Sequence, residues 1–136
     1  MPQEKLDAYE HHGMFHGTHP DVIDKIVENG FNRSFCGKNG TNYGNGVYFA
    51  TRSRYSNDFS NADAHGVKHM FLCSVLAGEY QVGRQGQIQP DERIGGSNKL
   101  YDSTTDSLDA QRRNMFVVYH DAQAYPHYLI EYRVAA

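Results

Sequence analysis

Two motifs in this sequence combine residue types and spacing that suggest chemistry. The 136 residues include eight histidines and ten tyrosines. His16 closes a short apolar stretch and is followed by Gly17 and Thr18, while Tyr48 lies in the run Val47-Tyr48-Phe49-Ala50. Histidine forms hydrogen bonds and transfers protons near neutral pH, and tyrosine offers an aromatic face for stacking. Each residue alone is also explained by a capped turn or a core aromatic, so their arrangement indicates more than either one.

Metal binding is a weaker interpretation of the histidines. His65 and His69 are four residues apart, but the segment between them is a turn and no glutamate follows His65, so the metalloprotease motif is absent. His11, His12 and His16 lie near one another along the chain without a distal pair of histidines or cysteines. We therefore expect no metal ion.

Thiol chemistry and phosphate cradles also lack a supporting motif. Cys36 lies in a loop and Cys73 in an apolar run, and no signature of a cysteine enzyme surrounds either residue. Glycines 37, 40, 44 and 46 make the loop glycine-rich, but no Lys-Ser/Thr pair follows and the loop precedes a strand. A Walker A loop and a dinucleotide fingerprint are therefore both excluded.

The elements that must position these residues are predicted to be about five strands and two short helices. Thr18 or His19 caps the first helix, and Gly30 ends it. Pro126 near the start of the last strand indicates a strand at or near a sheet edge. Early helices and late strands are typical of an α+β domain with antiparallel or mixed sheets. The predicted strands are 14–16, 47–50, 69–76, 115–119 and 125–134, the helices 20–29 and 52–59, and the long loops 31–46 and 83–97.

The composition indicates one ordinary globular domain. Hydrophobic residues make up 39% of the chain and charged residues 21%, with a formal net charge of −3. Such a charge, with no strong excess of basic residues, does not argue for duplex nucleic acid as an obligate partner. No apolar run reaches transmembrane length, and the polar, acidic start is no signal peptide, so we expect no membrane association and an intracellular location, cytoplasmic or nuclear. The abrupt start predicts a domain cut from a longer protein or a small member of its class.

A long ordered series of motifs resembles the poly(ADP-ribose) polymerase family of ADP-ribosyltransferases, also called diphtheria-toxin-like. The likeness is closest to the mono-ADP-ribosylating members that are joined to macrodomains or WWE domains. It implies a polar leader over residues 1–13 and an ADP-ribosyltransferase catalytic domain over 14–136. The implied fold is α+β, with two packed, mostly antiparallel sheets around a nicotinamide cleft and short flanking helices. The matching stretches are Phe15-His16-Gly17-Thr18, residues 30–39, residues 43–50, Lys68-His69-Met70, Val75-Leu76-Ala77-Gly78, Leu100-Tyr101-Asp102-Ser103, residues 116–121 and Gln123-Ala124-Tyr125-Pro126.

The resemblance also assigns the site. The family's His-Tyr-Glu triad falls on His16, Tyr48 and Met115, so a thioether stands where polymer-forming members carry a carboxylate. NAD+ is the implied co-substrate, with His16 on the adenosine-side ribose and Tyr48 on the nicotinamide ring. The backbone of Gly17 and the hydroxyl of Ser56 would bind the carboxamide. The implied NAD+-binding residues are His16, Gly17, Thr18, Arg33, Tyr48, Phe49, Ser56 and Phe59.

The implied function is mono-ADP-ribosyl transfer to an acidic acceptor, a protein carboxylate or a terminal phosphate, with release of nicotinamide. Met115 cannot activate a sugar hydroxyl, so elongation of a polymer should fail. Two alternatives stay open: an NAD+- or ADP-ribose-binding module without transfer activity, and an enzyme acting on nucleic-acid terminal phosphates. A local basic patch would serve the second alternative. We expect a monomer whose partners are NAD+ and an acceptor protein or nucleic-acid end. The basic patch comprises Arg33, Arg52, Arg54 and Lys68.

Overall fold

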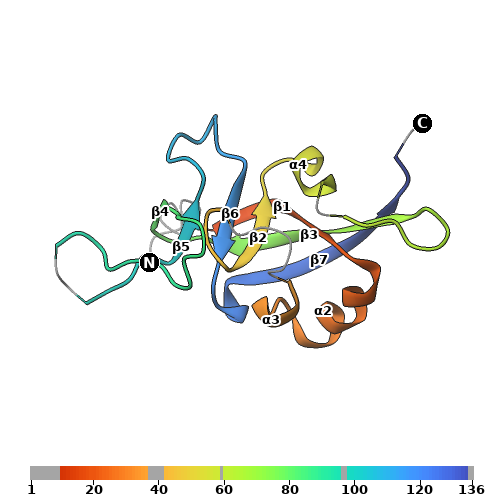
Figure 1. Ribbon diagram of the computed structural model, residues 1–136, viewed down its shortest axis with the longest axis horizontal. Helices are drawn as coiled ribbons and strands as arrows, with labels where there is room; N and C mark the ends of the chain where they lie inside the picture. Colours follow the sequence, from red (N-terminus) through yellow and green to blue (C-terminus); the bar gives the residue numbers. More distant parts are fainter. Residues whose placement is uncertain (1–9, 37–41, 59, 96–97, 135–136) are drawn as a thin grey trace.

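A computed structural model describes residues 10–36, 42–58, 60–95 and 98–134. These residues form seven strands and several short helical segments (Figure 1). The strands are β1 (Glu10–Thr18), β2 (Val47–Ala50), β3 (Lys68–Leu76), β4 (Tyr80–Val82), β5 (Ser103–Thr105), β6 (Met115–Val118) and β7 (Ala124–Tyr132). The helical segments are η1 (Pro20–Val22), α2 (Ile23–Asn29), α3 (Arg33–Cys36), α4 (Ser53–Asn57) and η2 (Asp121–Gln123). Within the described ranges, none of the helices has the length and apolar character needed to cross a membrane.

The strands form one hydrogen-bonded sheet in the order β4-β5-β6-β2-β1-β3-β7. Every neighbouring pair is antiparallel except β4 and β5, which are parallel. The α+β class is confirmed, but the expected two separate sheets are two halves of one sheet. The halves are joined where β1 meets β2, and this junction has a single residue pair, Phe15 with Ala50. β1 pairs with β3 along its length, so β1 belongs mainly to the half that contains β3 and β7.

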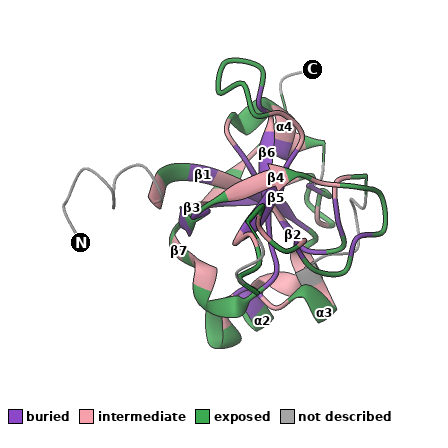
Figure 2. Ribbon diagram, turned by 90° about the vertical axis from the view of Figure 1, so that its left-hand side faces the viewer, coloured by how far each residue is buried: buried purple, intermediate pink, exposed green. Residues whose placement is uncertain are grey.

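The hydrophobic core is built around four phenylalanines. Phe31 packs edge-on against Phe49 and Phe71, with ring centroids 4.9 Å and 5.8 Å away. Ile26 of α2 is fully buried in the same cluster, so the helix closes one face of the sheet. Phe116 of β6 completes the set, and every residue of β6 is buried (Figure 2). The core cluster therefore covers the sheet at its centre, over β6, β2 and β1.

Most predicted elements are found, with differences at their ends. The helix over 20–29 appears as η1 and α2, with the His19 side chain accepting from the Asp21 N–H at its start. Pro126 lies in β7, which is at one edge of the sheet, as expected. α3 is a short helix inside the segment predicted as a loop, and β4 and β5 were not predicted. β1 begins at Glu10, inside the predicted leader, because Gly13 at φ +73° absorbs an irregularity in its pairing with β3.

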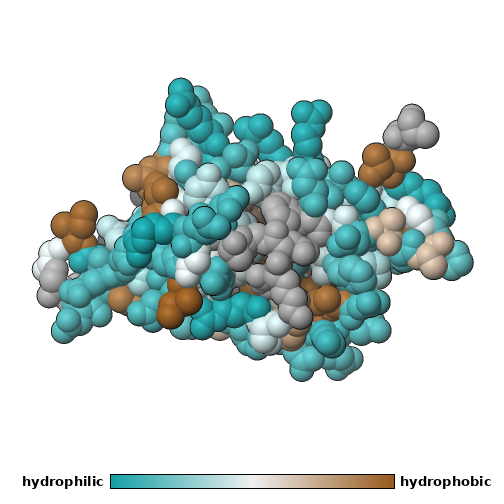
Figure 3. Space-filling view, in the orientation of Figure 1, coloured by the Kyte–Doolittle hydropathy of each residue, from teal (hydrophilic) through white to brown (hydrophobic). Residues whose placement is uncertain are grey.

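The visible surface is mainly hydrophilic (Figure 3). Hydrophobic side chains appear on it as separate spots, several of them at the end of the molecule where the segment between β4 and β5 lies. Ile88, Ile94 and Leu100 of that segment are exposed. Scattered exposed residues of this kind are normal for a globular domain.

Candidate active site

The His16 and Tyr48 motifs lie on either side of the junction between the two halves of the sheet. His16 belongs to β1, one residue beyond the Phe15–Ala50 pair, and Tyr48 belongs to β2. Nδ1 of His16 lies 2.8 Å from the backbone oxygen of Tyr48. One hydrogen bond therefore ties the two predicted residues together across the junction.

His16 is neutral and has a defined tautomer. A carbonyl oxygen only accepts, so Nδ1 must donate to Tyr48, and the remaining nitrogen, Nε2, is an acceptor. The ring is 5% exposed and packs against Phe31 and Phe49. Burial lowers the pKa of His16 to about 4, although the bond to the Tyr48 carbonyl raises it in part. His16 is thus prepared to accept a hydrogen bond from a hydroxyl group and is a poor general acid at neutral pH.

The Tyr48 side chain is anchored at its hydroxyl. Tyr48 Oη donates to the Gly44 carbonyl at 2.9 Å and accepts from the Tyr43 N–H at 3.0 Å. The ring is half-buried and packs against a cluster that contains Met115 and Tyr119. Burial raises the pKa of Tyr48 to about 12, so the phenol stays protonated and acts as a fixed aromatic surface.

Gly17 lies against the end of α4. A Cβ at this position would lie 2.1 Å from the Ser56 carbonyl oxygen and 2.5 Å from Ser60 Oγ, so any side chain would displace the helix. Ser56 is 2% exposed, and its hydroxyl has no hydrogen-bond partner among the described residues. A buried hydroxyl without a partner is unfavourable, and a polar ligand would supply the missing hydrogen bond. Thr18, the next residue of the motif, is also buried and donates to the His19 carbonyl.

Met115 is the first residue of β6 and lies opposite Ala50 of β2. Its side chain is 1% exposed. The Thr105 hydroxyl donates to the Met115 carbonyl at 2.7 Å, and the Met115 N–H lies 3.4 Å from a carboxylate oxygen of Asp106. The backbone of Met115 is therefore held by two hydrogen-bonding side chains, while its thioether packs beside the tyrosine cluster.

The remaining predicted NAD+-binding residues are placed differently. Phe49 is fully buried and contacts His16 at 5.3 Å between ring centroids, so its ring supports His16 from the core. Phe59 lies outside the described residues. Arg33 is exposed and donates to the Ile88 carbonyl at 2.9 Å, which places it beside the segment between β4 and β5.

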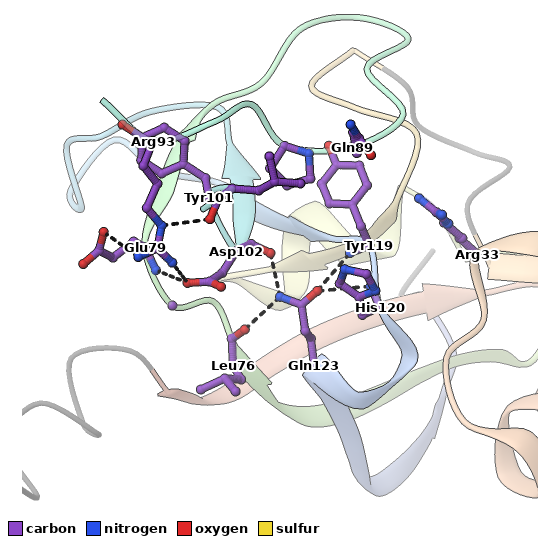
Figure 4. Close-up of a pocket in the computed structure, with 13 residues that line it drawn as sticks. Arg33, Leu76, Glu79, Gln89, Arg93, Tyr101, Asp102, Tyr119, His120 and Gln123 are labelled. Atoms are coloured by element: carbon purple, nitrogen blue, oxygen red, sulfur yellow. Dashed lines mark hydrogen bonds and ion pairs between the residues drawn. The ribbon is translucent and has the colours of Figure 1, made fainter. Parts of the chain in front are cut away.

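Arg33 also lines a separate cavity of about 700 Å³ (Figure 4). Arg33 and Arg93 lie on opposite sides of this cavity. Arg93 is neutralised there, because it pairs with Asp102 at 2.8 Å and with Glu79 at 3.3 Å. The structure brings His16, Gly17, Tyr48 and Ser56 together but does not place Arg33 in contact with them.

The residues of the predicted basic patch do not all lie together, because Arg33 is distant from the other three. Arg52 is the N-cap residue of α4 and Arg54 lies within it, and Lys68 at the start of β3 donates to Asn57 of the same helix at 3.3 Å. Arg33 is held beside Ile88 instead. The patch therefore consists of three residues around α4.

The structure describes the surroundings of one of the two cysteines, Cys73, while the side chain of Cys36 lies outside the described part. Cys73 is a fully buried core residue, and burial strongly raises the pKa of its thiol. Across residues 10–36, 42–58, 60–95 and 98–134, three or more potential ligands do not gather into a metal-binding group.

Comparison with known proteins identifies the family. The family model described as the poly(ADP-ribose) polymerase catalytic domain matches residues 3–134. The chain belongs to this family. It is 44% identical over 119 residues to the protein mono-ADP-ribosyltransferase PARP10 of Mus musculus, covering 86% of this chain and 12% of that protein. It is 42% identical over 123 residues to the protein mono-ADP-ribosyltransferase PARP14 of Homo sapiens, covering 88% of this chain and 7% of that protein.

The fold agrees with a solved structure of the same family. The crystal structure of the PARP domain of Arabidopsis RADICAL-INDUCED CELL DEATH1 matches with a TM-score of 0.74 at 16% identity. The match covers 98% of this chain and 78% of that chain. The poly(ADP-ribose) polymerase fold is therefore confirmed.

Several residues of this PARP domain were missed by sequence analysis. Ser60 is buried and donates to the carbonyls of Ser56 and His69, at 3.3 Å and 3.1 Å. Tyr43 and Thr104 lie behind Tyr48, where the Thr104 hydroxyl donates to the Tyr43 carbonyl at 2.8 Å. Tyr43 stands five residues before Tyr48 and could have been noticed, but no local signal marks Ser60 or Thr104.

Proposed function

We propose that this PARP domain is an NAD+-dependent mono-ADP-ribosyltransferase, which moves one ADP-ribose to an acceptor and releases nicotinamide. The observation that carries the proposal is the buried hydroxyl of Ser56, which lacks a partner among the described residues and belongs to a residue packed against Gly17. The carboxamide of nicotinamide is a ligand that would satisfy it. The mono-ADP-ribosyltransferase names of the relatives support the same activity.

The nicotinamide half of NAD+ is proposed to bind at the junction of β1 and β2. The Ser56 hydroxyl and the backbone of Gly17 would bind the carboxamide, and the anchored Tyr48 ring would form one wall. Phe59 is proposed as the opposite wall. A flat ring held between aromatic surfaces and away from water is oriented for loss as a leaving group.

The adenosine-side ribose is proposed to bind at His16. Nε2 of this neutral histidine accepts, and a ribose hydroxyl donates, so the two groups are complementary. The role is one of positioning, because at a pKa of about 4 the Nε2 atom is unprotonated at neutral pH and the Nδ1 proton is bonded to the Tyr48 carbonyl. Thr18 would support the same end of the ligand, and Arg33 stays a proposed contact to a more distant part of NAD+.

The reaction breaks the bond between nicotinamide and ribose, and positive charge develops on the ribose as it does in glycoside cleavage. Met115 has no carboxylate with which to deprotonate an incoming sugar hydroxyl. An acceptor that already carries negative charge needs no such base. We therefore propose an acidic acceptor, which is a protein carboxylate or a terminal phosphate.

The acceptor is proposed to be a protein, as for the named relatives. The three basic residues around α4 keep the ends of nucleic acids as the second candidate, because phosphate groups bind to such clusters. We further propose that the domain acts as an intracellular monomer with no metal ion.

Labelled NAD+ tests the proposed function. The domain is incubated with NAD+ labelled in the adenosine half, and label is followed on the domain itself, on added proteins and on 5′-phosphorylated oligonucleotides. We expect label on proteins, and its loss in His16→Ala, Tyr48→Ala and Ser56→Ala variants that remain folded. Ser53→Ala is the matched control, because Ser53 is an exposed serine of the same helix.

Three results would change the conclusion. Label on oligonucleotides alone would favour the nucleic-acid candidate. Tight binding of NAD+ without any release of nicotinamide would favour a binding module. Full activity of both the His16 and the Tyr48 variants would show that the site is wrongly assigned.

A further inference from the structure

The hydroxyl of Tyr48 is one end of a hydrogen-bond chain that leads through Tyr43 to the buried Thr104. The Tyr43 N–H, which donates to it, and the Gly44 carbonyl, which accepts from it, both belong to the segment that precedes β2. The position of the Tyr48 ring therefore depends on the position of residues 43 and 44. A group that holds the backbone of residues 43 and 44 in place therefore also helps to hold the Tyr48 ring in place.

Thr104 of β5 fixes it from behind. The Thr104 side chain is completely buried, and its hydroxyl donates to the Tyr43 carbonyl at 2.8 Å. Tyr119 Oη lies 2.9 Å from the same Thr104 oxygen. A threonine hydroxyl has one proton, which is used on Tyr43, so Tyr119 must donate to Thr104. The chain thus has a defined direction, from Tyr119 through Thr104 and Tyr43 to Tyr48.

The close packing of this region leaves the segment little freedom. Gly44 has φ +135°, and a Cβ there would lie 1.9 Å from Tyr119 Oη. A Cβ on Gly83 would lie 1.8 Å from the Tyr43 carbonyl oxygen. The backbone of residues 43 and 44 is therefore in direct contact with its neighbours, and the Thr104 hydroxyl is a polar group that orients it.

We propose that Thr104 is a positioning residue for the nicotinamide site: its hydroxyl, acting through Tyr43, sets the orientation of the Tyr48 ring. Tyr119 supports Thr104 by holding its hydroxyl in the donating direction. The inference rests on the proposed function, because it assumes that the Tyr48 ring contacts nicotinamide. Thr104 itself is completely buried, so the proposed role is indirect.

Binding of two ligands tests the proposal. Nicotinamide reports on the Tyr48 surface, whereas ADP-ribose lacks the nicotinamide ring and reports on the rest of the site. Calorimetric titration of Thr104→Val with both ligands should show nicotinamide binding weakened about tenfold, the loss expected for one hydrogen bond, and ADP-ribose binding unchanged. The turnover of NAD+ should fall with the nicotinamide affinity.

Two further variants separate positioning from simple destabilisation. Thr104→Ser keeps the hydroxyl and should restore nicotinamide binding. Ser103→Ala removes a neighbouring buried hydroxyl that donates to the Ala77 carbonyl at 2.7 Å, and it should leave both affinities unchanged. If Thr104→Val does not fold, Tyr119→Phe is decisive: weaker nicotinamide binding supports the proposal, and unchanged binding overturns it.

The outcomes also separate this inference from the proposed function. Equal weakening of both ligands by Thr104→Val would show a structural role and overturn the inference. Unchanged nicotinamide binding in Thr104→Val, together with a loss in Tyr48→Ala, would overturn the inference and leave the proposed function intact. A parent protein that binds neither nicotinamide nor NAD+ would overturn both.

Discussion

His16 shows how burial decides what a histidine can do. The ring packs against Phe31 and Phe49, and its Nδ1 bonds to a backbone carbonyl. In this environment the neutral form is strongly favoured, and the pKa falls to about 4 from the ordinary value of 6.5. Nε2 of His16 is therefore a hydrogen-bond acceptor over the whole physiological pH range.

The same pKa predicts a pH dependence of stability. Between pH 6.5 and 4 the unfolded chain protonates His16 while the folded chain does not, so the free energy of unfolding falls as the pH falls. The complete loss from this one group is about 3 kcal/mol. Urea unfolding of the parent and of His16→Gln at pH 7 and pH 4.5 measures it, and the parent should lose more stability than the variant. Equal losses in the two proteins would contradict a buried neutral His16.

Met115 leads to a prediction about product length. A thioether is no general base, and removing such a base typically costs ~10²–10⁴-fold in rate. Three carboxylates have contacts of their own: Glu79 pairs with Arg93, Glu131 lies 3.6 Å from His69, and Asp106 accepts from Asn114. We expect a single ADP-ribose at each modified site. Intact mass spectrometry and gels run before and after digestion with a chain-cleaving glycohydrolase would detect it, and a ladder of long chains would be incompatible with this reading.

At the scale of elements, Arg113 connects β6 to β4 through a buried cation. Its guanidinium carbon lies 4.5 Å from the centroid of the Tyr80 ring and 4.6 Å from that of Phe116. It also donates to the Tyr80 hydroxyl and to the carbonyls of residues 107 and 108. The flat, multiply donating group thus ties the segment before β6 to the aromatic side chains of two strands.

Substitution of Arg113 should show whether its positive charge or the planar shape of its guanidinium group stabilises the fold. Arg113→Lys keeps the charge but cannot make all three hydrogen bonds or stack as a plane, so it should lower the free energy of unfolding by about 2 kcal/mol. Arg112→Lys is the matched control, because the side chain of Arg112 is 83% exposed and its change should have little effect. Thermal unfolding of both variants provides the measurement, and similar melting temperatures would argue against a structural role for the buried guanidinium.

At the scale of the whole molecule, the parts that could be predicted from sequence are those with contiguous signals. His16 and Tyr48 stand in apolar runs that identify their strands, and Pro126 marks the edge strand correctly. β4 and β5 have three residues each, too few to show a periodicity. Thr104 and Arg113 look like polar loop residues, yet both are buried because strands distant in sequence close around them. Long-range pairing of this kind leaves no local signal.

The buried Cys73 offers a measure of global opening. This thiol is fully buried within β3, between strands on both sides, and its pKa is raised by burial. In a Cys36→Ser variant, a thiol reagent should label Cys73 only after unfolding, and labelling should follow the unfolding curve measured by circular dichroism. Rapid labelling of the native variant would show that β3 opens locally.

The position of β6 in the sheet also orders events during synthesis. β6 is the sixth strand along the chain, yet it lies between β5 and β2, and Val47 of β2 pairs with Val118 of β6. β2 shares only one residue pair with β1, so it has no other extensive partner in the sheet. A ribosome must therefore release almost the entire domain before β2 is secured. Until then the unpaired edges of β2 and β5 are accessible to chaperones and to other nascent chains. A chain truncated before β6 would keep these edges unpaired, and we expect it to be degraded.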